Sequence, residues 1–251
     1  MSVRDKVALV TGAGRGIGEA IADRLAAQGA AVAVCDLDPE AAAKVAGRLV
    51  ERYGVRATGV GADISDSAAV HAAVERVTVE LGPVDVLVNN AAVDIIGRFV
   101  DSTEDTWNRI IDVNLRGTIT VTRAVLDSMI GSGGGRIVHI ASDAGRVGSS
   151  GEVVYSATKG GVIAFGKALA REVARHGITV NSVCPGPTDT ALLGQVADYS
   201  QKMYDATVRA IPLRRVAQPD EIAGVVAFLA SDDAAYMTGQ TLSVSGGLTM
   251  V

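Results

Sequence analysis

Short runs of apolar, often β-branched residues alternate along the chain with longer Ala-rich stretches of helical periodicity. Strands that alternate with helices form parallel sheets covered on both faces. The pattern therefore predicts an α/β fold, a single doubly wound parallel sheet of about seven strands flanked by about six helices. The strand candidates are residues 6–10, 30–36, 56–63, 84–90, 135–142, 177–186 and 240–247.

The composition fits one large domain over residues 1–251, because no Pro/Ser-rich linker interrupts the pattern. The chain is 48% apolar and only 4% aromatic, so Ala, Val, Leu and Ile must build the core. The least regular part is residues 186–217, which suggests a loop with one or two short helices. Long irregular segments often bind ligands, so we expect this loop to form the variable wall of a substrate pocket.

Charge and cysteine usage argue against several classes of protein. A net charge of −5 argues against nucleic-acid binding, which usually needs a basic surface. Cys35 and Cys184 lack C-x-x-C spacing and the three histidines lack metal-ligand spacing, so neither a disulfide nor a metal site is expected. The apolar run near the N-terminus is too short for a signal peptide or a membrane span. We therefore expect a cytoplasmic protein that does not bind a membrane.

Three residues near the middle of the chain suggest proton chemistry. Ser142 is followed by Tyr155, and Lys159 lies four residues after the tyrosine. Side chains four apart share one face of a helix, so the ammonium can approach the phenol. A phenol titrates near about 10 and needs a neighbouring positive charge to act at neutral pH. The spacing favours an oxidoreductase acting on an alcohol carbon.

A glycine cluster follows the first strand candidate directly. Gly12, Gly16 and Gly18 form a G-x3-G-x-G pattern between a strand and a helix. Glycines there allow a sharp turn that brings backbone N–H groups to a pyrophosphate at the helix N-terminus. The cluster predicts a dinucleotide site, although any tight strand-to-helix turn can use glycine.

Asp36 ends the second strand candidate, where a carboxylate can accept hydrogen bonds from the adenosine ribose. A carboxylate repels a 2′-phosphate, so we expect NAD rather than NADP. Arg15 opposes this, because a cation in the glycine loop can pair with that phosphate. Asp36 is alternatively only part of a turn. Asp63 could accept from the adenine amino group or cap the next helix, and Asn90 could hold backbone geometry or touch the cofactor.

Together these motifs resemble the short-chain dehydrogenase/reductase family over essentially the whole chain. The resemblance rests on six ordered features besides Asp36: TGAGRGIG, LVNNAA, VNLRG with Asn114, Ser142, Y-x3-K at Tyr155 and Lys159, and PGPTDT. Each motif alone is weak, but six in the right order are specific.

The resemblance implies roles for individual residues. Tyr155 would exchange the substrate proton, Lys159 would lower the tyrosine pKa and hold the nicotinamide ribose, and Ser142 would bind the substrate oxygen. Asn114 would position a proton-relay water. The family also implies a homotetramer. Further cofactor contacts are implied at Ile17, Asn90, Val113, Pro185, Gly186 and Thr188.

Three segments are ASDAGRVGSSGEVVY, ARHGITVNSVCPGPTDTALL and ASDDAAYMTGQTLSVSGGLTM. Within the family, they resemble the 2-hydroxycyclohexanecarboxyl-CoA dehydrogenases, which oxidise a cyclic β-hydroxyacyl-CoA with NAD. A CoA thioester would need cations at the pocket mouth. Two alternatives remain: an NADPH-dependent 3-oxoacyl-thioester reductase of fatty acid synthesis, and a non-catalytic dinucleotide-binding sensor. The candidate cations are Arg98, Arg146, Lys202, Arg214 and Arg215.

Overall fold

The computed structural model describes residues 3–251, apart from the side chains of residues 195–197 and 203. Seven strands form one parallel sheet in the order β3-β2-β1-β4-β5-β6-β7, which confirms the predicted doubly wound fold. All seven strand candidates are strands: β1 (Val7–Thr11), β2 (Ala31–Asp36), β3 (Ala57–Gly61), β4 (Val86–Asn89), β5 (Gly135–Ile140), β6 (Ile178–Pro185) and β7 (Thr241–Val244).

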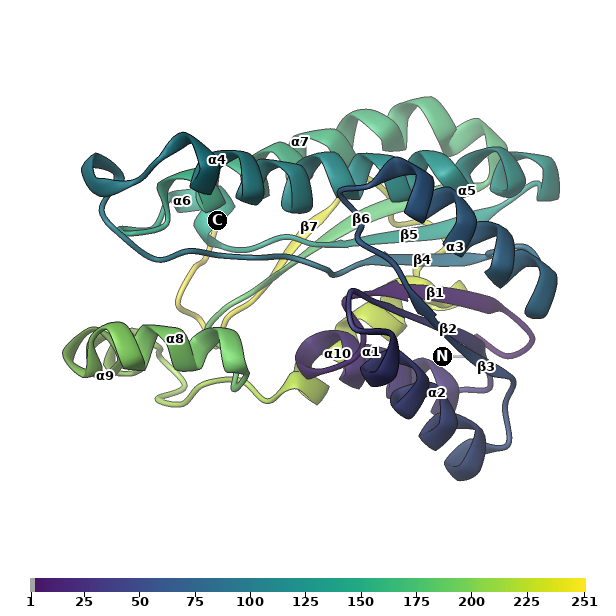
Figure 1. The fold of residues 1–251 in the computed structure, drawn as a ribbon, viewed down its shortest axis with the longest axis horizontal. Coiled ribbons are helices and arrows are strands. Elements are labelled where there is room, and N and C mark those ends of the chain that lie inside the picture. The colour runs from purple at the N-terminus through teal and green to yellow at the C-terminus, as the bar shows by residue number, and fades with distance from the viewer. Residues whose placement is uncertain (1–2) are drawn as a thin grey trace.

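Helices cover both faces of the sheet (Figure 1). One face carries α1 (Gly16–Ala27), α2 (Pro39–Tyr53) and α10 (Pro219–Ala230). The other carries α3 (Ser67–Glu80), α5 (Thr118–Ser132) and α7 (Val153–Val173). Strand β1 shows why both faces are apolar: Ala8 and Val10 join the core on the α1 side, and Val7 and Leu9 join the core on the α3 side.

The strand order reverses between β1 and β4, which are neighbours in the sheet although β2 and β3 lie between them in the chain. In open α/β sheets the ligand crevice lies at such a reversal, outside the carboxyl ends of the strands. The topology therefore places the ends of β1 and β4 at the predicted cofactor site.

The chain from α4 (Glu104–Ile111) to α5 passes through a π-helical turn at Asp112–Gly117. A π-helical turn is rare and is often found at functional sites. Here it buries Asn114, whose relative exposure is only 1%.

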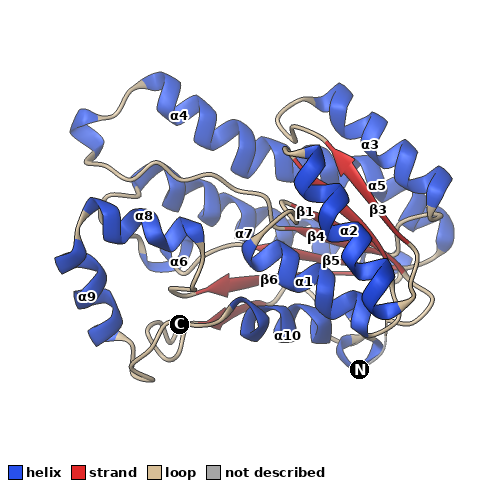
Figure 2. Cartoon of the chain, turned by 60° about the horizontal axis from the view of Figure 1, so that its bottom comes forward, coloured by secondary structure: helices blue, strands red, loops and turns tan. Residues whose placement is uncertain are grey.

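Residues 186–217 contain α8 (Ala191–Tyr199) and α9 (Gln201–Ala210). The two helices stand at the same end of the molecule as α6 (Ala144–Val147) and the start of α4 (Figure 2). That end is where the strands terminate. Short 3₁₀ turns lie at Phe99–Asp101, Ala174–His176 and Asp232–Ala234. Across the described residues, the structure contains no helix with the length and apolar character that a membrane span requires.

Candidate active site

The glycine loop packs too closely for side chains. Gly12 and Gly16 both have a φ of +61°, which favours glycine. A Cβ on Gly12 would lie 2.7 Å from the Ala91 Cα atom, and one on Gly18 would lie 2.2 Å from the Gly12 carbonyl oxygen. The loop therefore lies directly against the segment that follows β4.

The N-terminus of α1 fits a pyrophosphate. Asp38 precedes α2 and Asp66 precedes α3, and each aspartate side chain accepts hydrogen bonds from backbone N–H groups in the first turn of its helix. The residue before α1 is Arg15, whose side chain makes no such bond. The first backbone N–H groups of an uncapped helix point outward with a positive dipole, so α1 suits an anionic group.

Asn90 joins the glycine loop to the end of β1. Its side-chain amide donates to the carbonyl oxygens of Thr11 and Gly12, each at 2.9 Å. The Thr11 hydroxyl in turn accepts from the backbone N–H groups of Asn90 and Ala91, at 3.0 and 3.1 Å. This geometry corresponds to the structural alternative for Asn90. Thr11 was missed by the motif analysis, although its position directly before Gly12 could have revealed it.

Asp36 lies at the end of β2 and is half-buried. One carboxylate oxygen accepts from the Gly14 N–H at 2.8 Å, and the other accepts from the Asp38 N–H at 3.1 Å. A Cβ on Gly14 would lie 2.9 Å from the Asp36 carboxyl carbon, so a side chain here would displace that carboxyl group. The carboxylate thus faces the glycine loop, while Arg15 is exposed.

Asp63 does not cap the next helix, because Asp66 does so by accepting from Ala68 at 2.8 Å. Instead Asp63 accepts from the Ser65 N–H at 2.9 Å and from the Ser65 hydroxyl at 2.6 Å. The Ser65 hydrogen bonds and the nearby Arg109 guanidinium lower the pKa of Asp63 despite its partial burial. The capping alternative is therefore wrong, and the adenine contact stays a prediction.

The remaining cofactor candidates lie in α1, in the π-helical turn and at the end of β6. Ile17 lies in the first turn of α1, and Val113 is buried in the π-helical turn. After Pro185, the Gly186 N–H donates to Val244 at 3.0 Å, and the Thr188 hydroxyl donates to the Gly186 carbonyl at 2.9 Å. A Cβ on Gly16 would lie 3.6 Å from Thr190 Cγ2, so the start of the 186–217 segment adjoins the glycine loop.

Asn114 is held by both ends of its amide. Its oxygen accepts from the Val93 N–H at 2.8 Å, and its nitrogen donates to the Val93 carbonyl at 2.9 Å. The Asn114 backbone carbonyl accepts from the Thr118 hydroxyl at 2.8 Å. These bonds join the π-helical turn to the chain that leaves β4.

Ser142, Tyr155 and Lys159 meet beyond the end of β5. Tyr155 and Lys159 lie on α7, and the Lys159 Nζ is 5.5 Å from the centre of the Tyr155 ring. That nitrogen donates to the Ile140 carbonyl at 2.8 Å. The Ser142 hydroxyl accepts from the Ala144 N–H at 3.1 Å and interacts with the Tyr155 hydroxyl. The structure therefore brings together the three residues that the spacing selected.

Burial dominates the electrostatics of these groups. It lowers the pKa of Lys159 to about 8. Burial, followed by the carboxyl groups of Asp94 and Glu152, raises the pKa of Tyr155 well above that of a free phenol, while the Ser142 hydrogen bond lowers it. The lowering by Lys159 that the family resemblance implies stays a prediction.

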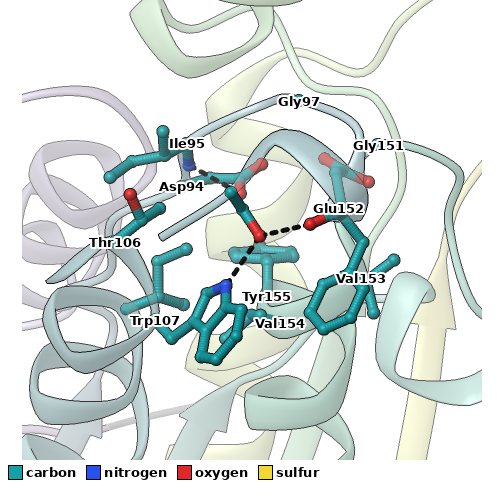
Figure 3. A pocket seen from close by; sticks show the side chains of 13 residues that line it. Asp94, Ile95, Gly97, Thr106, Trp107, Gly151, Glu152, Val153, Val154 and Tyr155 are labelled. Carbon is teal, nitrogen blue, oxygen red and sulfur yellow. Dashed lines mark hydrogen bonds between the residues drawn. The ribbon is translucent and has the colours of Figure 1, made fainter. Parts of the chain in front are cut away.

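Asp94 and Glu152 were missed by the sequence analysis. They line a cavity of about 20 Å³ together with Tyr155 and Trp107 (Figure 3). The Trp107 indole N–H donates to the Ser102 hydroxyl at 2.7 Å. Burial and the adjoining Glu152 carboxyl raise the pKa of Asp94 to about 7. No local pattern marks this pair, because the two residues are distant in the sequence.

Most of the cations considered for a CoA thioester already have partners within the protein. Arg98 pairs with Asp101 at 2.8 Å, and Arg215 pairs with Glu221 at 2.6 Å. Arg146 donates to the Ser243 hydroxyl at 2.6 Å, and Arg214 donates to a backbone carbonyl. Lys202 is exposed on α9. Within the described part of the chain, no group of three or more His, Cys, Asp or Glu side chains is arranged to hold a metal.

Comparison with known proteins yields full-length relatives. A family model described as enoyl-(acyl carrier protein) reductase matches residues 12–249. The 3-oxoacyl-[acyl-carrier-protein] reductase FabG of Escherichia coli K12 is 41% identical, and that of Vibrio harveyi is 39% identical; each covers 100% of both chains. The oxidoreductase UcpA of Escherichia coli K12 is 41% identical, with 98% of this chain and 95% of that protein covered.

These full-length matches agree with the parallel sheet, the glycine loop and the Ser142, Tyr155 and Lys159 cluster. The particular resemblance to cyclic hydroxyacyl-CoA dehydrogenases stays a prediction. The chain belongs to the short-chain dehydrogenase/reductase family and is a nicotinamide-dinucleotide-dependent oxidoreductase that acts on alcohol and keto groups.

Proposed function

We propose that the protein interconverts 3-oxoacyl and 3-hydroxyacyl thioesters. The observation that carries this substrate class is the full-length, 41% identity to an enzyme named as a 3-oxoacyl-[acyl-carrier-protein] reductase. These relatives favour the reductase alternative over the cyclic hydroxyacyl-CoA. The second candidate substrate, a cyclic β-hydroxyacyl-CoA, has the same reacting group and belongs in the same assay.

The geometry supports the following roles. In the reductive direction, Tyr155 gives its phenol proton to the substrate oxygen, and the Ser142 hydroxyl holds that oxygen. Lys159 adds positive charge next to the phenolate that remains. Asn114 holds the chain between β4 and the site in place through its bonds to Val93. When bound, the nicotinamide supplies or accepts the hydride.

For the cofactor, we propose NAD(H) rather than NADP(H). Asp36 supports this proposal, because its carboxylate lies at the end of β2 against the glycine loop, where a 2′-phosphate would meet negative charge. Arg15 is the residue that would favour NADP(H), and it is exposed at the start of α1.

Initial rates on one substrate panel test both parts of the proposal. The panel contains acetoacetyl thioesters of coenzyme A and of acyl carrier protein, a cyclic β-keto thioester, and simple ketones, each with NADH and with NADPH. We expect turnover of the thioesters and faster turnover with NADH. A preference for NADPH would contradict the role of Asp36, and turnover of simple ketones alone would contradict the substrate class.

If the protein binds a dinucleotide but turns over no substrate of the panel, a non-catalytic sensor would be favoured. The cytoplasmic location, the single domain over residues 1–251 with its substrate loop at 186–217, and the homotetramer are also parts of this proposal.

A further inference from the structure

Two carboxyl groups lie beside the tyrosine of the site. Asp94 belongs to the segment after β4, and Glu152 is the residue that precedes α7. Both line the small cavity with Tyr155, and Figure 3 shows the three side chains in one close group. Asp94 is only 8% exposed. Asp94 therefore lies in a poorly hydrated space next to the reacting phenol, with the half-buried Glu152 beside it.

The carboxyl groups of Asp94 and Glu152 are neighbours in this cavity, and Glu152 is one of the groups that raise the pKa of Asp94. Two negative charges beside each other and next to buried groups are unfavourable, which favours one retained proton. A proton on one carboxyl group also lets that group donate to the other, which a carboxylate cannot do. The backbone N–H of Ile95 donates to Asp94 at 2.8 Å and fixes its orientation.

The pair acts on the other titratable groups of the site. Its negative charge raises the pKa of Tyr155, and Asp94 also raises the pKa of Lys159. The other titratable groups facing Tyr155 and Lys159 come from several elements: Cys184 from β6, with Asp143 and Arg146 near its thiol, and His139 from β5.

We propose that Asp94 and Glu152 are positioning residues whose carboxyl groups hold one proton between them, and that the net charge of this pair sets the pH range in which Tyr155 serves as proton donor. In ketone reduction, the O–H bond of Tyr155 breaks, a new O–H bond forms on the substrate oxygen, and the phenolate keeps the electron pair. Negative charge beside that phenolate opposes its formation before substrate is present. The pair therefore keeps Tyr155 protonated up to higher pH.

The first test needs no substrate. Infrared spectra of the wild-type protein and of Asp94→Asn, recorded between about pH 5 and 9, report the carbonyl stretch of a protonated carboxylic acid. We expect a band that disappears as the pH rises through about 7 in the wild-type protein and is missing in the variant. A wild-type protein without that band would overturn the proposal.

The second test is the pH profile of kcat/KM in both directions, with any substrate that the protein turns over. In Asp94→Asn and Glu152→Gln the oxidative rate should extend to lower pH, with at least about a threefold rise relative to wild type near pH 6 after normalisation at high pH. Profiles that superimpose on the wild-type profile would overturn the proposal. Glu104→Gln, an exposed carboxylate at the start of α4, is the matched control.

This inference rests on the oxidoreductase activity but not on the proposed thioester substrate. A protein that shows the infrared band but rejects every thioester contradicts only the proposed function. If Asp94→Asn fails to fold, Glu152→Gln carries the same test, because Glu152 is only half-buried.

Discussion

Tyr155 is deeply buried, although its proposed role is to exchange a proton with the substrate. Its side chain is 8% exposed, and burial opposes ionisation of the phenol. The Ser142 hydrogen bond lowers the pKa of Tyr155 and so favours the phenolate, and we expect the positive charge of Lys159 to do the same. The proposed proton transfer depends on the hydroxyl group of Tyr155.

Removal of that hydroxyl should separate catalysis from binding. In Tyr155→Phe we expect the turnover rate to fall by about 100-fold or more, the usual effect of losing a general acid, with dinucleotide affinity largely retained. Steady-state kinetics and titration calorimetry measure the two effects. Tyr236→Phe is the control, because Tyr236 is fully exposed. Unchanged turnover in Tyr155→Phe would exclude this residue from the mechanism.

His139 is a buried base in the core of the sheet. It has no exposed surface, and its Nδ1 accepts from the Asn89 amide at 3.1 Å when the ring proton is on Nε2. No partner for Nε2 is found in the described part of the structure. Burial, followed by the Lys159 charge, lowers the pKa of His139 to about 3.

A base that stays neutral in the folded state destabilises the protein in acid. Because the folded pKa of His139 is below its usual value of 6.5, the unfolded state binds more protons between about pH 6.5 and 3. The free energy of unfolding should fall over that window, and His139→Gln should make the fall shallower. Asp94 has the opposite effect. Because its folded pKa is raised to about 7, the free energy of unfolding falls as the pH rises from about 4 to 7.

Urea unfolding as a function of pH measures the slopes. His71→Gln, on the exposed side of α3, should leave the slope unchanged. Equal slopes in wild type and His139→Gln would show that the folded state tolerates a charge at this position.

At the scale of elements, the strands were predictable because each is a short β-branched run between turn residues. The π-helical turn at Asp112–Gly117 was not predicted, since its residues continue a helical pattern and nothing local marks the change of hydrogen bonding. The motifs placed Gly12, Gly16 and Asp36 correctly in one region. Thr11, Gly14, Asp94 and Glu152 escaped because their roles come from contacts between distant segments.

The glycine loop and α1 form one tightly packed element. In Gly18→Ala the new methyl would meet the Gly12 carbonyl at 2.2 Å, so we expect a loss of about 1–3 kcal/mol in the free energy of unfolding and weaker dinucleotide binding. Chemical denaturation and calorimetry measure both. Gly47→Ala on α2 is the matched control, because nothing lies within 4 Å of its new methyl.

That control should stabilise the protein by up to about 1 kcal/mol, the difference between Gly and Ala in a helix. Equal stabilities for Gly18→Ala and the wild-type protein would mean that the loop relaxes away from α1.

For the whole molecule, the predicted homotetramer requires apolar surface. Exposed apolar side chains occur on α4 and α5, including Ile111 at 38% and Ile119 at 40% exposure. A Cβ on Gly161 would lie 3.2 Å from Leu115 Cδ1, and one on Gly160 would lie 3.1 Å from the Gly145 carbonyl oxygen, so these two glycines after Lys159 allow close packing within the chain.

Sedimentation equilibrium should give the mass of four chains. We expect Ile119→Asp to lower that mass, because a charge would be buried in the subunit interface. Val79→Asp on α3, where the side chain is 81% exposed, should leave it unchanged. A monomer mass for the wild-type protein would contradict the tetramer.

Because the Gly14 N–H donates to Asp36, a change of cofactor preference depends on the order in which substitutions are made. A lineage that replaced Asp36 to admit a phosphate would also leave the Gly14 N–H without its acceptor. The replacement would weaken the loop before any benefit from the new cofactor appeared. The order of substitutions would then matter: a residue that supplies a new acceptor must arrive first or together with the change, so a single-step exchange of Asp36 is a poor starting point for cofactor engineering.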